Sequence, residues 1–227
     1  MNNIKKITLY LLLSVLYQPA YAVDKALDVT IDFKCLGWAA SSRNAKLYYV
    51  TDNEPQLLKM NELFRSDKYD YTGGRNLSFY EKSADGKLKK ISNVRINGKA
   101  KDWLFIFIKE GSDQYKVLGL EDGSKSYPGG SFRFYNISTR DMGLKLGDDV
   151  SVIKVKSMHR SVPKYTKHKM IPVELAEIVA SSGKARFVYS NSWIQRKNIR
   201  RLTFIRDSMK TESGVVQLKV IEDYVIK

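Results

Sequence analysis

The amino-acid sequence predicts an all-β protein of the β-sandwich, immunoglobulin-like class. Apolar and polar residues alternate with a period of two along most of the chain, which is the spacing of strands with one buried face. The alternating segments are short, rich in Tyr, Phe, Val and Ile, and separated by turn sequences such as Asp85-Gly86. About ten such segments at this spacing are typical of one β-sandwich or of two packed units.

The first 22 residues have the three parts of a secretory signal peptide. Lys5 and Lys6 precede an apolar run at 7–17, and Pro19 comes just before the small residue Ala22. The apolar run is shorter than the roughly 20 residues that a membrane-spanning helix needs. We therefore expect cleavage after Ala22, a mature protein in the periplasm or outside the cell, and no transmembrane segment.

The first predicted strand of the mature chain covers residues 29–36. Val29, Ile31, Phe33 and Cys35 alternate along it and share one face. A single cysteine excludes a disulfide within the chain, and with two histidines it falls short of the usual Cys/His zinc ligands. We expect Cys35 to be a small core residue and not a reactive nucleophile.

The same alternation predicts ten further strands. They cover residues 46–50, 76–82, 87–96, 103–109, 115–120, 131–137, 150–156, 185–190, 199–206 and 215–221. The stretch at 55–64 has apolar spacing that suits either a short helix or an extended crossover. A second short helix is predicted at 173–180, where Pro172 precedes Glu174 at a typical helix start.

A boundary between two units is predicted at the Pro-Gly-Gly turn of residues 128–130, after which strand-like segments resume with a different charge balance. The segments at 103–109 and 114–118 also resemble those at 202–206 and 215–219, which suggests internal duplication. The resulting division is a signal peptide at 1–22, a first β-rich unit at 23–130 and a second, basic β-rich unit at 131–227. One continuous sandwich is the alternative.

The Pro-Gly-Gly turn is followed by the aromatic strand Ser-Phe-Arg-Phe-Tyr-Asn-Ile-Ser at 131–138, and a Leu-x-Leu-Gly-Asp turn lies at 144–148. In these motifs, and in strand order from about residue 27 to 207, the chain resembles exported bacterial β-sandwich proteins of unknown function. The resemblance implies the fold and export only. It implies no chemistry and no functional residue.

The strongest functional signal is the distribution of charge. The chain carries a net charge of +15, and between Lys145 and Lys210 fifteen basic residues stand against five acidic ones. Such a segment attracts anionic polymers, surfaces or acidic proteins. Because export points away from nucleic acid, the compatible partners are an anionic polysaccharide, lipopolysaccharide, a lipid headgroup or an acidic protein. The alternative is a solvated basic surface that only serves solubility.

The predicted binding residues lie in two basic clusters of the second half. Arginine presents a planar fork that suits phosphate and carboxylate, so Arg196, Arg200 and Arg201 are the first choices, with Trp193 as an aromatic floor. The full predicted set is Lys164, Lys167, Trp193, Arg196, Lys197, Arg200 and Arg201.

No motif in the sequence fixes a reaction. A Gly-x-Ser-x-Gly elbow is absent from it, and His159 and His168 lie among lysines without the further ligands of a metal site. We therefore expect a non-enzymatic binding or assembly module with no metal and no cofactor. The alternative is an envelope glycan hydrolase that uses two first-half carboxylates. The available carboxylates are Asp32, Asp52, Glu54, Asp67 and Asp70.

Aromatic residues are numerous in the first half of the chain. On an exposed sheet face such residues stack on sugar rings, whereas in a core they form cross-strand pairs, which is the commoner arrangement. The residues in question are Trp38, Tyr48, Tyr49, Tyr69, Tyr71, Tyr80 and Trp103.

Overall fold

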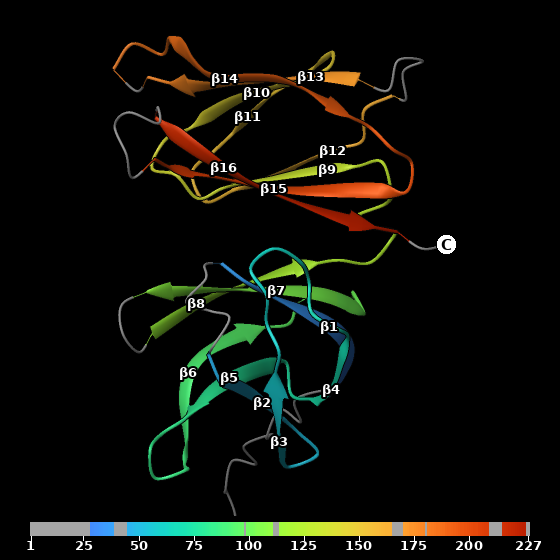
Figure 1. Ribbon diagram of the computed structural model, residues 1–227, viewed down its shortest axis with the longest axis vertical. Coiled ribbons are helices and arrows are strands. Elements are labelled where there is room, and N and C mark those ends of the chain that lie inside the picture. Colours follow the sequence, from blue (N-terminus) through green and yellow to red (C-terminus); the bar gives the residue numbers. More distant parts are fainter. Residues whose placement is uncertain are drawn as a thin grey trace, which may run out of the picture.

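The computed structural model describes residues 28–38, 45–97, 99–110, 114–164, 170–179, 181–208 and 215–225. Over these residues the protein is all-β and contains four sheets of four strands each (Figure 1). The predicted β-sandwich class is confirmed, whereas its immunoglobulin-like character stays a prediction. The predicted signal peptide lies outside the described residues. Within the described part of the chain, no helix is long and apolar enough to cross a membrane.

The first eight strands form one sandwich of two sheets. They are β1 (Val29–Gly37), β2 (Leu47–Thr51), β3 (Glu54–Leu58), β4 (Tyr69–Gly73), β5 (Asn76–Lys82), β6 (Leu88–Arg95), β7 (Asp102–Glu110) and β8 (Gln114–Glu121). We call the sheet β4-β1-β7-β8 the first inner sheet and the sheet β3-β2-β5-β6 the first outer sheet.

The last eight strands form the second sandwich. They are β9 (Phe132–Asn136), β10 (Met142–Leu146), β11 (Asp149–Ile153), β12 (Met158–Ser161), β13 (Met170–Ile178), β14 (Ala185–Ile194), β15 (Ile199–Asp207) and β16 (Val216–Tyr224). The second inner sheet has the order β12-β9-β15-β16, and the second outer sheet has the order β11-β10-β13-β14.

The two sandwiches have the same topology, because each strand of the first has an equivalent eight strands later. The inner sheets each contain one parallel pair, β1 with β7 and β9 with β15. Both outer sheets also have a register shift at equivalent places, between Phe79 and Tyr80 and between Leu175 and Ala176. The similar segments at 103–109 and 202–206 fall on the equivalent strands β7 and β15. Those at 114–118 and 215–219 fall on the equivalent strands β8 and β16.

All eleven predicted strands are present, with ends that differ by a few residues. The alternation did not predict the strands β3, β4, β10, β12 and β13. Three of these, β3, β4 and β12, are short strands at sheet edges, where the alternation is short and partly exposed. The strand β10 alternates regularly, with Met142, Leu144 and Leu146 buried, but it is only five residues long.

The short helix predicted at 173–180 is absent, and of the two alternatives for 55–64 the structure has the extended one. The stretch at 55–64 begins as the edge strand β3, and the stretch at 173–180 lies almost entirely within β13. In β13, Val173 and Leu175 point into the core, while Glu174 lies on the other face and pairs with Lys145 of β10 at 3.4 Å. Alternation of this kind needs a period of two, so pairing with β10 overrides the helix-start signal at Pro172.

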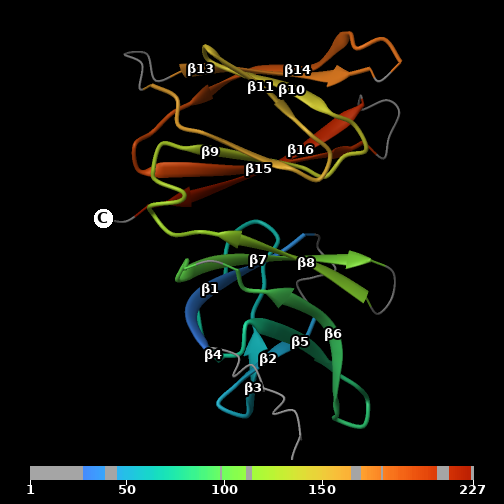
Figure 2. The same cartoon turned by 180° about the vertical axis from the view of Figure 1, so that it is seen from behind.

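The four sheets stack as four layers, with the two inner sheets facing each other (Figures 1 and 2). One apolar core lies inside each sandwich. A third lies between the sandwiches, where Leu104 and Ile106 of β7 pack with Leu202 and Phe204 of β15. Because β7 is covered on both faces, its sequence Trp-Leu-Phe-Ile-Phe is an unbroken apolar run and not a simple alternation.

Cys35 is a buried free thiol in the core of the first sandwich, as the sequence predicted. Burial raises the pKa of the Cys35 thiol well above its ordinary value. The thiolate that reacts with electrophiles is therefore scarce even in mildly alkaline solution.

We expect iodoacetamide to label native Cys35 slowly at pH 7 and at pH 9, and to label the unfolded chain fast at pH 9. The unfolded thiol ionises at its ordinary pKa and the native thiol does not. The free energy of unfolding should therefore fall as the pH rises through the ordinary pKa of the thiol. Mass spectrometry of timed samples measures the labelling. Native labelling at the unfolded rate would contradict a core position for this residue.

Candidate functional site

Arg200 was predicted to lie on an exposed surface patch, but the structure does not place it there. Its side chain is 9 % exposed and sits between the two sandwiches. The guanidinium donates to the Asp122 carboxylate at 3.0 Å, to Asp223 at 2.7 Å and to the Tyr127 carbonyl oxygen at 3.0 Å. Arg200 therefore has a structural role, because buried acceptors on both sandwiches hold its guanidinium in place.

A buried ion network surrounds Arg200. Arg65 follows β3 and pairs with Asp122, and it lies 3.2 Å from Asp223 of β16. Burial raises the pKa of Asp122, against the lowering effect of Arg65 and Arg200. The guanidinium of Arg200 also lies 4.9 Å from the ring centre of Tyr127, which is fully buried. The network joins the first sandwich to the second at one end of their interface.

Arg201 and Trp193 also have structural partners. Arg201 pairs with Glu222 at 2.6 Å, donates to the Ile194 carbonyl oxygen and lies 5.5 Å from the Phe132 ring centre. The Trp193 ring stacks on Phe132 at 6.0 Å between ring centres, against the core of the second sandwich. The predicted aromatic floor for a ligand is thus part of the sandwich packing.

Lys164, Arg196 and Lys197 are exposed, as binding residues need to be. Lys164 follows β12, and the other two lie in the turn between β14 and β15. Lys167 lies outside the described residues.

Three loop segments bring these exposed residues to one end of the second sandwich. The Gln195 side chain donates at 3.0 Å to the carbonyl oxygens of both Gly130 and Pro163, so it ties the segments before β9, after β12 and before β15 together. In both ribbon views these segments lie at the end where the chain enters the second sandwich (Figures 1 and 2).

Two more exposed basic residues, Lys125 and Arg160, belong to the same end. Arg160 donates a hydrogen bond to the Ser126 carbonyl oxygen, next to Lys125. Ser161, the residue after Arg160, donates a hydrogen bond to the Asp149 carboxylate at 2.8 Å. We call the following set the basic end: Lys125, Arg160, Lys164, Arg196 and Lys197.

Gly129 sets how closely the loops of the basic end approach. A Cβ atom at this position would overlap the carbonyl oxygen of Lys197, so only glycine allows the two backbones to touch here. Gly130 has a φ of +80°, a conformation that glycine adopts without strain. A hollow of about 440 Å³ beside this contact is lined by Gly129, Lys197, Asn198 and Val225.

Lys125 was not predicted as a binding residue, because it lies 71 positions before Arg196 and outside the basic second half of the chain. The Pro-Gly-Gly turn that follows Lys125 was the available signal. Two adjacent glycines mark a place where another backbone comes close, and here that backbone carries Arg196 and Lys197.

A second feature, which we call the junction cleft, opens between the two sandwiches beside the ion network. It has a volume of about 360 Å³. Its walls include Asp32, Lys68, Asp102 and Trp103 from the first sandwich, and Arg200 and Tyr224 from the second.

The carboxylates in the junction cleft come from neighbouring strands. Asp32 of β1 and Asp102 of β7 are register partners in a parallel pair, on the sheet face that also carries Leu36 and Leu104 of the interface. Asp32 pairs with Lys68 at 3.0 Å, and this contact raises the pKa of Lys68. The Asp102 carboxylate makes no hydrogen bond to any described side chain or backbone group.

The carboxylates named for the hydrolase alternative are divided between distant places. Asp32 and Asp70 are register partners on β1 and β4 of the first inner sheet. Asp52 and Glu54 lie at the turn between β2 and β3 of the outer sheet, where Asp52 has a φ of +50°. Asp67 is exposed in the segment before β4.

The histidines and acids of the described chain form no cluster of three or more that is arranged to hold a metal ion. Burial lowers the pKa of His159, and Asp149 opposes that shift. His168 lies outside the described residues.

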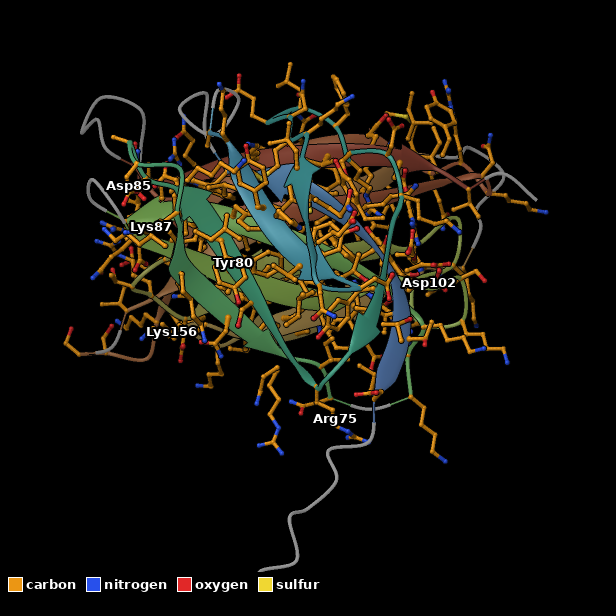
Figure 3. The ribbon with its side chains drawn as sticks, turned by 90° about the horizontal axis from the view of Figure 1, so that it is seen from below. Arg75, Tyr80, Asp85, Lys87, Asp102 and Lys156 are labelled. Atoms are coloured by element: carbon orange, nitrogen blue, oxygen red, sulfur yellow. The ribbon has the colours of Figure 1, made fainter. Side chains whose placement is uncertain are left out.

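Most first-half aromatic residues pack in cores. Tyr49, Tyr69 and Phe33 form a cluster with ring centres 5.0 to 5.9 Å apart, and Trp38 packs edge-on against Phe204 at 4.9 Å. Tyr71 and Trp103 belong to the first core. Tyr48 and Tyr80 are half-buried register partners on the outer sheet, and Figure 3 labels Tyr80 there.

Comparison with known proteins identifies no relative: no protein-family model matches the chain, and no curated protein is detectably similar to it in sequence. The resemblance to exported β-sandwich proteins therefore stays a prediction.

Proposed function

We propose that this protein is an exported, non-enzymatic binding or assembly module whose basic end holds an anionic component of the cell envelope. Its two β-rich units, residues 23–130 and 131–227, form the scaffold. The observation that carries the proposal is the gathering of five exposed basic residues, from three loop segments and the strand β12, at one end of the second sandwich.

The surroundings of the basic end support binding more than general solubility. Several other cations of the second half are neutralised locally: Lys145 by Glu174, Lys154 by Asp141 and Arg186 by Glu177. By contrast, Lys125, Arg160, Lys164 and Arg196 form no ion pair with a carboxylate of the described residues. Exposed charges of one sign in one place create a field that concentrates an anionic ligand.

The rigidity of the basic end favours specific binding over diffuse attraction. Its loops are tied by the two hydrogen bonds of Gln195, by the contact between Gly129 and Lys197 and by the bond from the Gly130 amide to the Ile199 carbonyl oxygen at 2.8 Å. Loops held in this way lose less conformational entropy when a ligand orders them.

Replacing Lys164, Arg196 and Lys197 together by Gln should weaken binding to vesicles that contain lipopolysaccharide by about 100-fold, because each basic residue near an anionic surface contributes about 1 kcal/mol. Co-sedimentation at several salt concentrations measures the effect. Binding of the wild-type protein should weaken steeply with salt, and the triple variant should have a shallower salt dependence. The three residues are exposed, so the thermal midpoint should not change.

The matched control replaces Lys87, Lys89 and Lys90 by Gln, which removes the same charge from the β5–β6 hairpin. These lysines are exposed as well, and Figure 3 places Lys87 on the opposite side of the molecule from Asp102. The control variant should bind like the wild type. An equal loss in both variants would show that the positive charge serves only solubility.

A further inference from the structure

The junction cleft adjoins the basic end. Val225 lines both the cleft and the hollow beside Gly129 and Lys197. Ser124, which also lines the cleft, directly precedes Lys125. A ligand longer than one small group can therefore lie across both places at once.

The two places differ in their chemistry. The basic end presents exposed cations, whereas the junction cleft combines the carboxylates of Asp32 and Asp102 with the cations of Lys34 and Lys68. An ionised carboxylate is an acceptor only, so these groups repel an anionic group and accept hydrogen bonds from hydroxyls. The ammonium of Lys68, 3.0 Å from Asp32, adds donors on the same wall.

The cleft also has the shape and position of a ligand site. Its volume of about 360 Å³ is sufficient for a small ring system, and small-molecule sites occur preferentially where two units meet. Its carboxylates Asp32 and Asp102 stand on the paired strands β1 and β7, which hold them in place. Tyr224 is 61 % exposed at its edge and offers an aromatic face to the apolar side of a sugar ring.

We propose that the junction cleft binds a hydroxyl-bearing sugar unit of an acidic polysaccharide whose charged groups lie on the basic end. This inference rests on the proposed function and names its ligand class. A lipid phosphate or an acidic peptide satisfies the basic end alone, whereas an acidic glycan carries hydroxyls and anionic groups along one chain. Only such a chain uses the acceptors of the cleft and the cations of the basic end together.

Isothermal titration calorimetry with hyaluronan oligomers of increasing length tests the inference on the full chain, because their charged glucuronic acid units alternate with uncharged N-acetylglucosamine units. Affinity should rise once an oligomer is long enough to reach from the basic end into the cleft. The variants Asp102→Ala and Tyr224→Ala should each weaken binding of a long oligomer by about tenfold. Tyr224→Phe, which keeps the ring, should bind like the wild type, and circular dichroism checks that each variant is folded.

The outcomes separate the two proposals. If Asp102→Ala and Tyr224→Ala bind like the wild type while the basic-end triple variant fails to bind, the cleft inference is wrong and the proposed function stands. If the wild type binds lipopolysaccharide vesicles but no hyaluronan oligomer, the cleft inference is again wrong. If the triple variant binds both probes like the wild type, the proposed function is wrong, and with it the inference that rests on it.

Discussion

Asp122→Asn is expected to lower the free energy of unfolding by about 3–5 kcal/mol, because removing one partner of a buried ion pair leaves the opposite charge uncompensated. Asp122 accepts from Arg65 of the first sandwich and from Arg200 of the second, and its side chain is 6 % exposed. Asparagine keeps the shape of the side chain, so the effect reports the charge. Denaturant titration followed by circular dichroism measures it.

The control for this prediction is Asp32→Asn, which breaks an exposed pair with Lys68 and should change stability little. A second check combines Asp122→Asn with Arg65→Gln. Because the two residues share one network, the double variant should lose less unfolding free energy than the two single variants lose in sum. Equal small losses for Asp122→Asn and Asp32→Asn would mean that the network does not hold the sandwiches together.

Phe204→Ala should also cost about 3–5 kcal/mol of unfolding free energy, through lost burial and the cavity that is left. Phe204 is fully buried between the sandwiches, where its ring lies 4.9 Å from that of Trp38 and 6.2 Å from that of Tyr135. The contact joins β15 to the segment after β1, so the loss falls on the interface between the units. Thermal and denaturant unfolding of the same variant measure it.

Phe187→Ala is the matched control, since Phe187 is 72 % exposed on the edge strand β14. It should change stability by no more than about 0.5 kcal/mol. If Phe204→Ala unfolds at the same denaturant concentration as this control, the inner sheets do not depend on each other for stability.

The prediction of strands succeeded where one face of a strand is buried and the other is not. In β5, Leu77 and Phe79 alternate with half-exposed residues, and the predicted bounds match those observed. It failed at β13 because Glu174 after Pro172 has the local features of a helix start, while the pairing with β10 that decides the conformation is not local.

The candidate site was predicted only in part. Arg196, Lys197 and Lys164 are exposed and come together, but Arg200 and Arg201 are buried and paired. The four arginines at 196–206 cannot be told apart from the sequence. Arg200 and Arg201 become buried only when the two sandwiches pack and both faces of the strand β15 are covered. The junction cleft was not predicted, since Asp32 and Asp102 become neighbours only through the parallel pairing of β1 with β7.

By itself the sequence determined the all-β class, most of the strands and the core position of Cys35, because each depends on alternation that is read within a few residues. The tertiary structure alone decided the stacking of two like sandwiches, the membership of the basic end and which charges are buried. Arg200 and Asp122 are 78 positions apart. Whether a charged side chain faces solvent or a buried partner depends on such distant pairs. A local sequence pattern contains no information about them.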